Sequence, residues 1–463
     1  MTFDRKDLSN EQLVDFYKKL LWPRMIEEKM LVLLRQGKIS KWFSGIGQEA
    51  ISVGATLALQ QDEWIMPLHR NLGVFTTRGM PLSKLFMQWQ GAQEGYSKGR
   101  ERSFHFGNKD HHICGMISHL GPQLAIADGI ALAHKIRNEK KVSLAFSGDG
   151  GTSEGDFHEA LNTAAVWDLP VIFIIENNGY GLSTPVSEQY RCISLVDKAK
   201  GYGMEGVKID GNNLLEVYDT IKGVREYCLN NQKPYLIECT TFRMRGHEEA
   251  SGIKYVPPDL LKLWEMKDPI KKYEQFLIEA DVINETSIIA IRNEFKDKIE
   301  RELAIGASTK AVVADTEEEL EDVYAQSDVR RESSVRVVDN SGITHHSPLT
   351  THDLRLIDAI KEGLHQSMQE HPNLILMGQD IAEYGGAFKI TEGFVNDFGK
   401  ERVRNTPLCE SAIVGAALGL SLEGYKSMME MQFADFATVG FNQIINNMAK
   451  IHYRWGQNAD VVI

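Results

Sequence analysis

The stretch SLAFSGDGGTSEGDFHEALNTAAVWDLPVIFIIENNGY, from Ser143 to Tyr180, decides the fold of this chain. It reads as a buried strand, a glycine-rich turn, a helix, a second buried strand and an Asn-Asn-Gly-Tyr turn. A strand-helix-strand unit predicts two parallel strands, whose carboxyl ends meet at the sheet edge where open α/β sheets bind ligands. We therefore expect Asp149 and Asn178, each of which follows one of these strands, to lie in a ligand site.

The oxygen atoms at these two strand ends suit a hard cation that holds a diphosphate. Mg²⁺ prefers near-octahedral oxygen ligation, and a few protein ligands leave positions for phosphate oxygens and water. We predict that Asp149, Asn178 and the backbone carbonyl of Tyr180 bind the metal. Three glycines in the first turn allow the main chain to approach the diphosphate: Gly148, Gly150 and Gly151. A tight turn without any ligand is the structural alternative.

The same stretch resembles the thiamine diphosphate motif. Its fuller form, SEGDFHEALN followed by LPVIF and ENNGYGLSTPVSEQY, is similar to the α subunit of 2-oxoacid dehydrogenase components. Within that family the resemblance is to the branched-chain type, and STPVSEQY from Ser183 carries much of this preference. A capped, proline-containing surface loop is the structural alternative for STPVSEQY. The resemblance implies thiamine diphosphate and Mg²⁺ as cofactors.

Length and composition indicate a globular protein of more than one domain. The chain has 463 residues, 43% of them hydrophobic, and a formal net charge of −13, which argues against a nucleic-acid partner. Its first residues are charged and amphipathic, and no segment is long and apolar enough for a membrane, so we predict no membrane partner and a cytoplasmic location. The five cysteines form no CxxC pair, which predicts packing thiols.

Alternation of apolar strands with amphipathic segments extends from about residue 8 to 310 and predicts a doubly wound parallel sheet covered by helices. Strands are expected at 142–146, 171–175 and 235–240, and a charged helix at 288–303. The polar segment that follows contains the acidic run DTEEELED. We predict an α-subunit-like domain at 1–312, an acidic linker at 313–349 and a β-subunit-like domain at 350–463.

The second unit starts with LRLIDAIKEGLHQSMQEH, which has helical spacing, and continues with the strand-like HPNLILMGQD. Three stretches resemble the β subunit of the same family: GQDIAEYGGAFKITEGF, RVRNTPLCESAIVGAALGL and MEMQFADF. The resemblance implies an α subunit fused to a β subunit. Because a β subunit of this family continues past NADVVI, we expect a fragment that lacks a family active-site histidine and much of the dimer interface. The fold implied is the α/β thiamine diphosphate-binding fold, with doubly wound parallel sheets and a second, partial α/β domain.

Glu410 is the expected catalytic carboxyl group. Thiamine diphosphate is activated when a protein carboxyl group engages its aminopyrimidine ring, and Glu410 in TPLCESAIVGAALGL matches the family's cofactor-activating glutamate. Its apolar neighbours, which include Leu408, predict burial and a raised pKa. A helix N-terminal carboxylate that stabilises the helix dipole is the structural alternative.

The resemblance implies further cofactor contacts in the first unit. In ISHLG, Leu120 supports the bent cofactor and Ser118 offers a polar contact; by composition alone this segment is a loop that leads into a helix. In IMPLHRNLG, Arg70 binds the diphosphate with His69 beside it, although relatives commonly carry tyrosine at the position of His69. A solvated surface arginine is the structural alternative.

His247, in FRMRGHEEASG, matches the family's mobile active-site loop, where a histidine exchanges protons near neutral pH. Arg243 is a candidate neighbour for the substrate carboxylate or the lipoyl loop. Glu248 stands where regulated relatives place a phosphorylatable serine, which predicts no kinase control there. In the second unit, Phe433, Asp435 and Phe436 match a segment near the cofactor ring; core packing is the alternative for this segment.

The resemblance implies oxidative decarboxylation of a branched-chain 2-oxoacid of the 3-methyl-2-oxobutanoate type, with acyl transfer to the lipoyl group of an acyltransferase core. The site is expected between the two units, in a homodimer of the fused chain. Pyruvate or acetoin as substrate, and a non-catalytic cofactor-binding scaffold, remain alternatives. A nicotinamide-dependent dehydrogenase is disfavoured because no strand is followed by Gly-x-Gly-x-x-Gly.

Overall fold

The computed structural model of the chain describes residues 1–101, 103–309, 312–313, 315–325 and 355–463. The first unit is built on a parallel sheet of five strands in the order β1-β2-β3-β7-β6. The strands β2 and β3 are buried over almost their whole length, because helices cover both faces of the sheet. The five strands are β1 (Ile65–Met66), β2 (Ser143–Gly148), β3 (Val171–Asn177), β6 (Glu205–Asp210) and β7 (Tyr235–Thr240).

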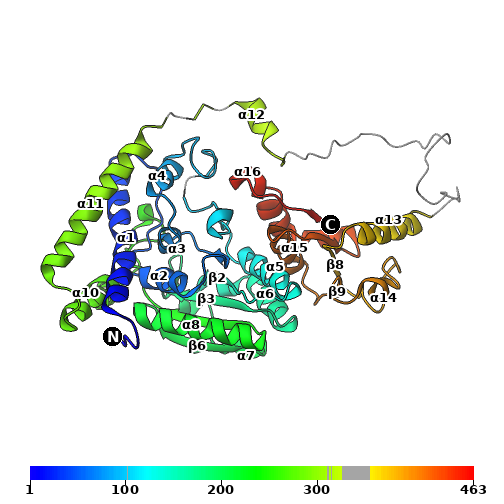
Figure 1. Cartoon of the computed structure of the whole chain (residues 1–463), viewed down its shortest axis with the longest axis horizontal. Helices are drawn as coiled ribbons and strands as arrows, with labels where there is room; N and C mark the ends of the chain where they lie inside the picture. Colours follow the sequence, from blue (N-terminus) through cyan, green and yellow to red (C-terminus); the bar gives the residue numbers. More distant parts are fainter. Residues whose placement is uncertain (102, 310–311, 314, 326–354) are drawn as a thin grey trace.

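The helices of this unit surround the sheet (Figure 1). Those that matter most for the site are α5, which precedes β2, and α6, which joins β2 to β3. The helices are α1 (Asn10–Arg35), α2 (Glu49–Ala58), α3 (Leu72–Thr77), α4 (Leu82–Gln90), α5 (Pro122–Ile136), α6 (Gly155–Val166), α7 (Asp197–Gly201), α8 (Leu214–Asn231), α9 (Pro258–Glu265), α10 (Pro269–Glu279) and α11 (Glu285–Ala307). A short hairpin of β4 (Tyr180–Gly181) and β5 (Thr184–Pro185) follows β3.

The α/β fold predicted from the sequence is confirmed. The three expected strands are β2, β3 and β7, with ends that differ from the prediction by at most two residues. The charged helix predicted at 288–303 is the central part of α11. This helix begins at Glu285 because the Asn284 side chain caps it, accepting a hydrogen bond of 2.9 Å from the amide of Ser287.

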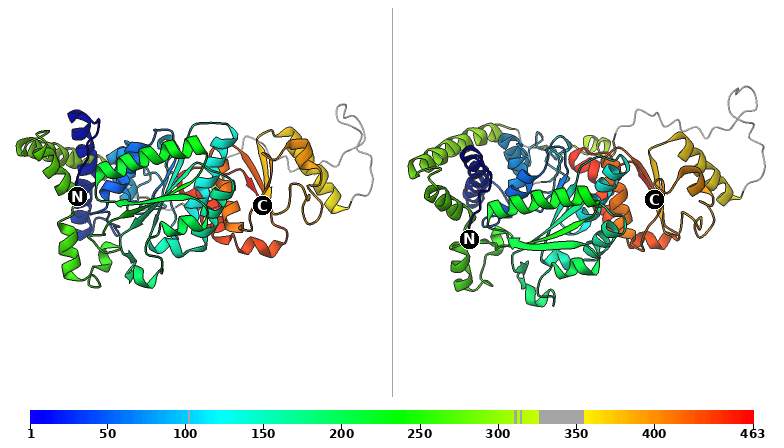
Figure 2. Two further views of the ribbon diagram at one scale, coloured as in Figure 1. Left: turned by 90° about the horizontal axis from the view of Figure 1, so that it is seen from below. Right: turned by 60° about the horizontal axis from the view of Figure 1, so that its bottom comes forward.

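The second unit contains a parallel sheet in the order β11-β10-β8-β9. The segment NADVVI supplies β11. The elements are α13 (Leu356–Glu370), β8 (Leu374–Gly378), α14 (Phe394–Phe398), β9 (Val403–Asn405), α15 (Glu410–Leu422), β10 (Lys426–Glu430), α16 (Ile451–Trp455) and β11 (Val461–Val462). Figure 2 shows this unit at the end of the molecule opposite α1 and α11.

Part of the predicted acidic linker is helical. The side chain of Asp315 caps α12 (Thr316–Glu321) by accepting hydrogen bonds from the amides of Glu317 and Glu318, at 2.9 and 3.2 Å. The sequence did not predict this helix, because six mostly acidic residues are too few to show a helical pattern of apolar positions. The later part of the linker prediction, residues 326–349, lies outside the described residues.

The two units share one hydrophobic core, in which α5 crosses α15 at very close range. A Cβ atom at Gly129 of α5 would lie 2.0 Å from the carbonyl oxygen of Ala416. Likewise, a Cβ atom at Gly419 of α15 would lie 2.1 Å from the carbonyl oxygen of Ile126. The helices can approach this closely only because glycine occupies both positions.

Replacing Gly129 with alanine is therefore expected to lower the free energy of unfolding by about 1–3 kcal/mol, because the added methyl group forces α5 and α15 apart. Gly223 of α8 is the matched control, since a Cβ there meets no atom within 4 Å. Gly223→Ala is expected to be neutral or to stabilise by up to about 1 kcal/mol. Chemical denaturation of both variants tests this, and equal behaviour would contradict the close crossing.

All five cysteines are free thiols, and Cys114, Cys228, Cys239 and Cys409 are buried, as expected for packing residues. A search of the helices in the described ranges finds none with the length and apolar character needed to cross a bilayer.

Candidate functional site

The turn after β2 presents Asp149 at the carboxyl end of the sheet, and this side chain is only 2% exposed. Its Oδ1 accepts a hydrogen bond of 2.9 Å from the amide of Gly150, whereas its buried Oδ2 has no hydrogen-bond partner among the residues that the structure describes. Burial raises the pKa of Asp149 to about 6, and the Gly150 amide and the Arg243 guanidinium lower it. A buried carboxylate oxygen without a partner is unfavourable unless a cation or a proton joins it, so this donor fits Mg²⁺.

The turn after β3 brings Asn178 to the same sheet edge, because β2 and β3 are parallel neighbours with Gly148 opposite Glu176. Asn178 is 6% exposed, and its Oδ1 accepts a hydrogen bond of 3.2 Å from the amide of Tyr180. The neighbouring Gly179 has a φ of 85°, which lets the chain reverse within this turn. Asp149 and Asn178 therefore lie as the sequence predicts, and the Tyr180 carbonyl belongs to the adjoining residue.

In the turn after β2, Gly148 borders open space, whereas Gly150 and Gly151 are in close contact with other parts of the chain. A Cβ at Gly148 would meet no atom within 4 Å, so this position faces open space. A Cβ at Gly150 would lie 2.9 Å from Cα of Gly181, in the hairpin that follows β3. A Cβ at Gly151 would lie 2.6 Å from Oγ of Ser147 and 3.6 Å from Cβ of Leu120. The turn can thus accept a ligand at Gly148 while it packs against Leu120 behind.

A buried basic cluster lies beside this turn. Arg70 follows β1 and is 5% exposed, and its Nη1 donates to the carbonyl of Ser44 at 2.9 Å. Its Nη2 lies 2.6 Å from His69 Nε2 and 3.4 Å from His247 Nδ1. The rings of His69 and His247 are 5.2 Å apart, and Phe43 contacts both. His69 and Arg70, which were predicted from one motif, therefore meet His247, which was predicted from another.

Both histidines of this cluster are neutral near pH 7. Burial and the charge of Arg70 hold the pKa of His69 well below its usual range. The same causes, together with Arg243, lower the pKa of His247 to about 4. A neutral ring nitrogen can accept the guanidinium N–H groups of Arg70, which agrees with the observed distances.

Arg243 is also buried and belongs to the loop that carries His247. Its Nη2 donates to the carbonyl of Leu182 at 2.6 Å and lies 2.7 Å from the hydroxyl oxygen of Tyr255. The cluster thus holds two buried guanidinium groups, and burial with the nearby charge of Arg243 lowers the pKa of Arg70 to about 10. Excess buried positive charge of this kind suits an anionic ligand such as a diphosphate or a carboxylate.

Two buried glutamates beneath the cluster were missed in the sequence. Glu176 of β3 accepts hydrogen bonds from Asn71 at 2.6 Å and from Gln48 at 3.1 Å. Glu27 of α1 accepts from the hydroxyl of Ser44 at 2.6 Å and so supports the residue whose carbonyl binds Arg70. Burial raises the pKa of each carboxyl group to about 7. A single acidic residue inside the apolar strand VIFIIEN was the available signal for Glu176.

The burial of Glu27 predicts a pH-dependent stability. Its pKa is about 7 in the folded protein against 4.5 for an ordinary glutamate. Between these values the folded state holds the proton that the unfolded state has released, so the free energy of unfolding decreases as pH rises, by up to about 3 kcal/mol. Glu27→Gln should remove this part of the slope. Urea denaturation of both proteins from pH 4.5 to 7.5 tests it, and parallel curves would contradict it.

The segment predicted to support the cofactor leads into α5. Leu120 is half-buried against the Gly151 turn, and Ser118 is exposed, with its Oγ 3.5 Å from Nε2 of His105. His105 was not identified from the sequence, yet it is one of the charges that lower the pKa of His69. Leu120 thus lies against the turn after β2, and Ser118 lies near His105.

Glu410 belongs to the second unit and is the first residue of α15. Its Oε1 accepts a hydrogen bond of 3.0 Å from Nε2 of Gln379. The amide of Ala412, in the same turn, donates to Glu159 of α6 at 3.0 Å. Glu410 is half-buried and the adjacent Leu408 is 82% exposed, so the site is more open than the apolar flanks suggested. The start of α15 nevertheless faces the start of α6, directly after the Asp149 turn.

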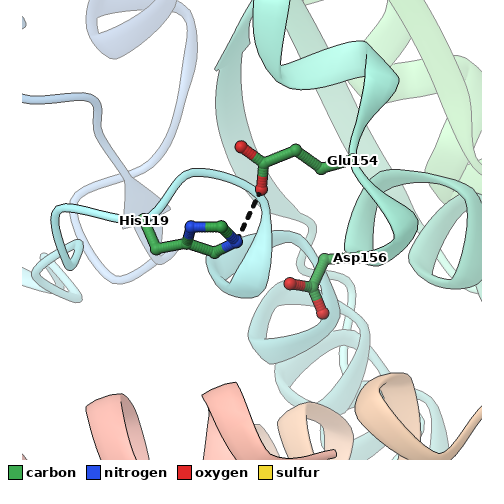
Figure 3. A group of neighbouring side chains, drawn as sticks. All are labelled: His119, Glu154 and Asp156. Atoms are coloured by element: carbon green, nitrogen blue, oxygen red, sulfur yellow. Dashed lines mark ion pairs between the residues drawn. The ribbon is translucent and has the colours of Figure 1, made fainter. Parts of the chain in front are cut away.

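His119, Glu154 and Asp156 form a polar group at the seam between the units. Figure 3 shows Glu154 and Asp156 at the start of α6, with Nε2 of His119 3.1 Å from Oε2 of Glu154. Burial raises the pKa of Glu154 to about 7. The carboxylate of Asp156 already accepts hydrogen bonds from Ser411 and, at 3.3 Å, from Asn442. We therefore regard the group as a junction between the units rather than a metal site.

Phe433 and Phe436 remain on the surface side of the second unit. Their rings are 5.3 Å apart, and Phe433 also lies 5.8 Å from Phe388. Phe433 is 51% exposed, Phe436 is half-buried and Asp435 is exposed. These aromatic contacts lie within the second unit, so the structure does not bring Phe433 into the cluster around Asp149 and Arg70.

Both units of the chain are similar to known protein families. Residues 17–314 match the family described as Dehydrogenase E1 component, and residues 352–462 match the pyrimidine binding domain of transketolase. The 2-oxoisovalerate dehydrogenase subunit alpha of Bacillus subtilis is 36% identical over 329 residues, covering 69% of this chain and 97% of the relative. The alpha subunit of acetoin:2,6-dichlorophenolindophenol oxidoreductase from the same species is 35% identical, covering 68% and 95%.

The pyruvate dehydrogenase E1 component subunit alpha of Staphylococcus aureus is 33% identical over 281 residues, covering 60% of this chain and 74% of the relative. The chain therefore belongs to the dehydrogenase E1 component family, as a thiamine diphosphate-dependent 2-oxoacid dehydrogenase component in which a pyrimidine-binding domain follows the α-type part.

Proposed function

We propose that this protein catalyses the oxidative decarboxylation of a branched-chain 2-oxoacid and transfers the acyl product to the lipoyl group of an acyltransferase. The observation that carries the proposal is the unpartnered, buried Oδ2 of Asp149 beside the buried cations Arg70 and Arg243. A carboxylate that needs a cation, next to guanidinium groups that need an anion, is the arrangement that a metal-bound diphosphate satisfies.

In this proposal Asp149, Asn178 and the carbonyl of Tyr180 hold Mg²⁺. The open face of Gly148 would receive the diphosphate, and Arg70 and His69 would bind it. Leu120, which packs on the Gly151 turn, supports the bent cofactor, and Ser118 adds a polar contact. On the side of the second unit, Phe436 and Phe433 are assigned to the aminopyrimidine ring, which requires Phe433 to turn inward.

Bound thiamine diphosphate supplies a nucleophilic carbon and an electron sink for loss of carbon dioxide. Glu410 engages the pyrimidine nitrogen and holds a proton there. Arg243 binds the substrate carboxylate. His247, which is neutral near pH 7, accepts or donates a proton at the substrate oxygen, and its position against Arg70 sets its orientation.

The branched-chain preference rests on the segment after Asn178. The residues of STPVSEQY form the second strand of the β4–β5 hairpin and the turn beyond it. The carbonyl of Gln189 accepts a hydrogen bond of 3.3 Å from Ser153, next to the diphosphate turn. This contact joins the segment to the proposed site and supports its assignment to substrate preference. Pyruvate and acetoin remain the second candidates because relatives that carry those names are nearly as similar to this chain.

The exposed aromatic surface of the second unit supports a homodimer of the fused chain. Phe388 and Phe441 are 48% and 54% exposed, and neither is assigned to the cofactor. A second copy is the occupant that we propose for this surface. The lipoyl-bearing acyltransferase is proposed as the further partner, and the cytoplasmic location stays a prediction from the sequence.

The test is reduction of an artificial electron acceptor by the purified protein with 3-methyl-2-oxobutanoate, pyruvate and acetoin, with and without thiamine diphosphate and Mg²⁺. Cofactor-dependent reduction with the highest kcat/KM for the branched acid supports the proposal. A higher kcat/KM for pyruvate or acetoin would change the proposed substrate but would leave the proposed cofactor chemistry unchanged. Cofactor binding without reduction in any of the three reactions supports a scaffold and overturns the proposal.

A further inference from the structure

A loop formed by residues 103–121 carries Ser118 and Leu120 and contains two arms that run side by side. Asn108 and Ile113 exchange backbone hydrogen bonds of 2.8 and 3.0 Å, which join the arms. A Cβ at Gly107 would lie 2.7 Å from the amide nitrogen of Gly115, so the arms touch closely. We call this segment the bend loop, because its end is assigned to the bend of the cofactor.

An arginine from the second unit ties both arms of the bend loop together. Arg454 of α16 is 6% exposed, and its Nη2 donates to the carbonyl of His105 at 3.0 Å and to that of Met116 at 3.4 Å. Its Nε lies 3.2 Å from Oε1 of Glu101, just before the loop. One guanidinium group therefore reaches acceptors at the start and near the end of the same loop.

A second arginine makes the opposite contact, from the first unit to α16 of the second unit. Arg100 of the first unit donates to the carbonyl of Tyr453 at 2.8 Å, and its guanidinium carbon lies 4.1 Å from the centre of the Tyr453 ring. The acidic helix α12 covers the pair, because Nε of Arg100 lies 2.8 Å from Oε2 of Glu319 and its Nη1 lies 2.5 Å from Oδ2 of Asp322. The hydroxyl of Tyr453 also donates to Glu319 at 2.7 Å.

The two carbonyls that Arg454 binds belong to residues close to Ser118. Nε2 of His105 lies 3.5 Å from Oγ of Ser118, and the charge of His105 contributes to the lowered pKa of His69. Met116 precedes Ser118 by two residues. We propose that Arg454 is a positioning residue that makes the shape of the bend loop, and hence the affinity for thiamine diphosphate, depend on the docked second unit. This inference rests on the proposed cofactor site.

The chemistry of arginine explains why this residue suits the task. Its planar guanidinium group presents several N–H donors in fixed directions, so it can hold two carbonyls and a carboxylate at once. Lysine has one compact charged group and cannot span the two arms in the same way. Removal of the guanidinium group leaves the carbonyls of His105 and Met116 without this buried donor, which frees the arms to move apart.

The experiment compares Arg454→Met and Arg454→Lys with a matched variant, Arg402→Met. Arg402 also binds carbonyls with its guanidinium group, those of Met368 and His371 at 2.7 Å, but these lie inside the second unit. Each full-length variant is titrated with thiamine diphosphate and Mg²⁺ by calorimetry. Without cofactor, amide hydrogen exchange of residues 103–121 and the melting temperature are measured.

We expect Arg454→Met to weaken cofactor binding about tenfold or more and to speed exchange in the bend loop, since a lost buried charged hydrogen bond typically costs this much. Arg454→Lys should show a smaller effect in the same direction, and Arg402→Met should lower the melting temperature with cofactor affinity unchanged. Binding by Arg454→Met within twofold of wild type, or equal weakening by Arg402→Met, overturns the inference. A wild-type protein that binds no cofactor contradicts the proposed function itself.

Discussion

Replacing Asp149 with alanine is expected to abolish cofactor binding and activity together. Asp149 supplies a buried carboxylate oxygen without a hydrogen-bond partner, at the sheet edge where Asn178 and the Tyr180 turn converge. Without this oxygen the proposed Mg²⁺ site loses its one anionic protein ligand. We expect the affinity for thiamine diphosphate in Mg²⁺ to fall by more than about 100-fold, a larger loss than is typical when only an outer-shell partner is removed.

Asp210 provides the control for this prediction. It ends β6, at the carboxyl edge of the same parallel sheet, and its Oδ1 accepts a hydrogen bond of 3.0 Å from the amide of Asn212. Asp210→Ala therefore removes a carboxylate from an equivalent strand end that has no part in the basic cluster. Calorimetric titration should show unchanged cofactor affinity for Asp210→Ala. If Asp149→Ala kept its affinity for thiamine diphosphate, the assignment of Asp149 as a metal ligand would be wrong.

The alanine variant should also gain stability without cofactor. In the folded protein burial raises the pKa of Asp149 to about 6, so at pH 7 the ionised group opposes folding. A higher melting temperature of cofactor-free Asp149→Ala, combined with lost binding, is the pattern expected of a group kept for function rather than for stability. A lower melting temperature would indicate a structural role for the carboxylate.

The sequence was sufficient for the part of the site that is local in the chain. Continuous apolar runs predicted β2 and β3, and parallel pairing then required Asp149 and Asn178 to meet at one edge. Arg70 and His247 are distant in the chain, and the sequence related them only through the family resemblance. Their contact, at 3.4 Å, becomes visible only in the folded chain.

The parts that could not be predicted depend on how the two units dock. The crossing of α5 and α15 relies on Gly129 and Gly419, which within a helix read as unremarkable small residues. Arg454 is buried and Arg100 is half-buried, and each donates to at least one backbone carbonyl of the other unit, which no local pattern in the sequence indicates. The sequence overestimated the burial of Glu410 because the prediction used only the residues next to it in the chain. The exposure of Glu410 depends instead on the elements that face the start of α15.

Replacing Glu410 with glutamine is expected to separate binding from catalysis. The amide keeps the size of the side chain and its contact with Gln379, so the cofactor should still bind with an affinity within a few-fold of wild type. Glutamine cannot hold the proton that the pyrimidine nitrogen requires, and loss of such a proton-transfer group typically lowers the rate by about 10²- to 10⁴-fold. We expect kcat with the preferred 2-oxoacid to fall within this range while KM changes little.

Glu423, at the other end of α15, is the control that isolates chemistry from packing. Its carboxylate accepts a hydrogen bond of 2.7 Å from the indole of Trp64 and pairs with Arg137, so it joins the two units without approaching the site. Glu423→Gln should lower the melting temperature and leave hydrogen–deuterium exchange at the thiazolium carbon unchanged. Glu410→Gln should slow that exchange and leave the melting temperature unchanged. If both variants slow it equally, Glu410 acts by holding α15 against α6 and the catalytic assignment is wrong.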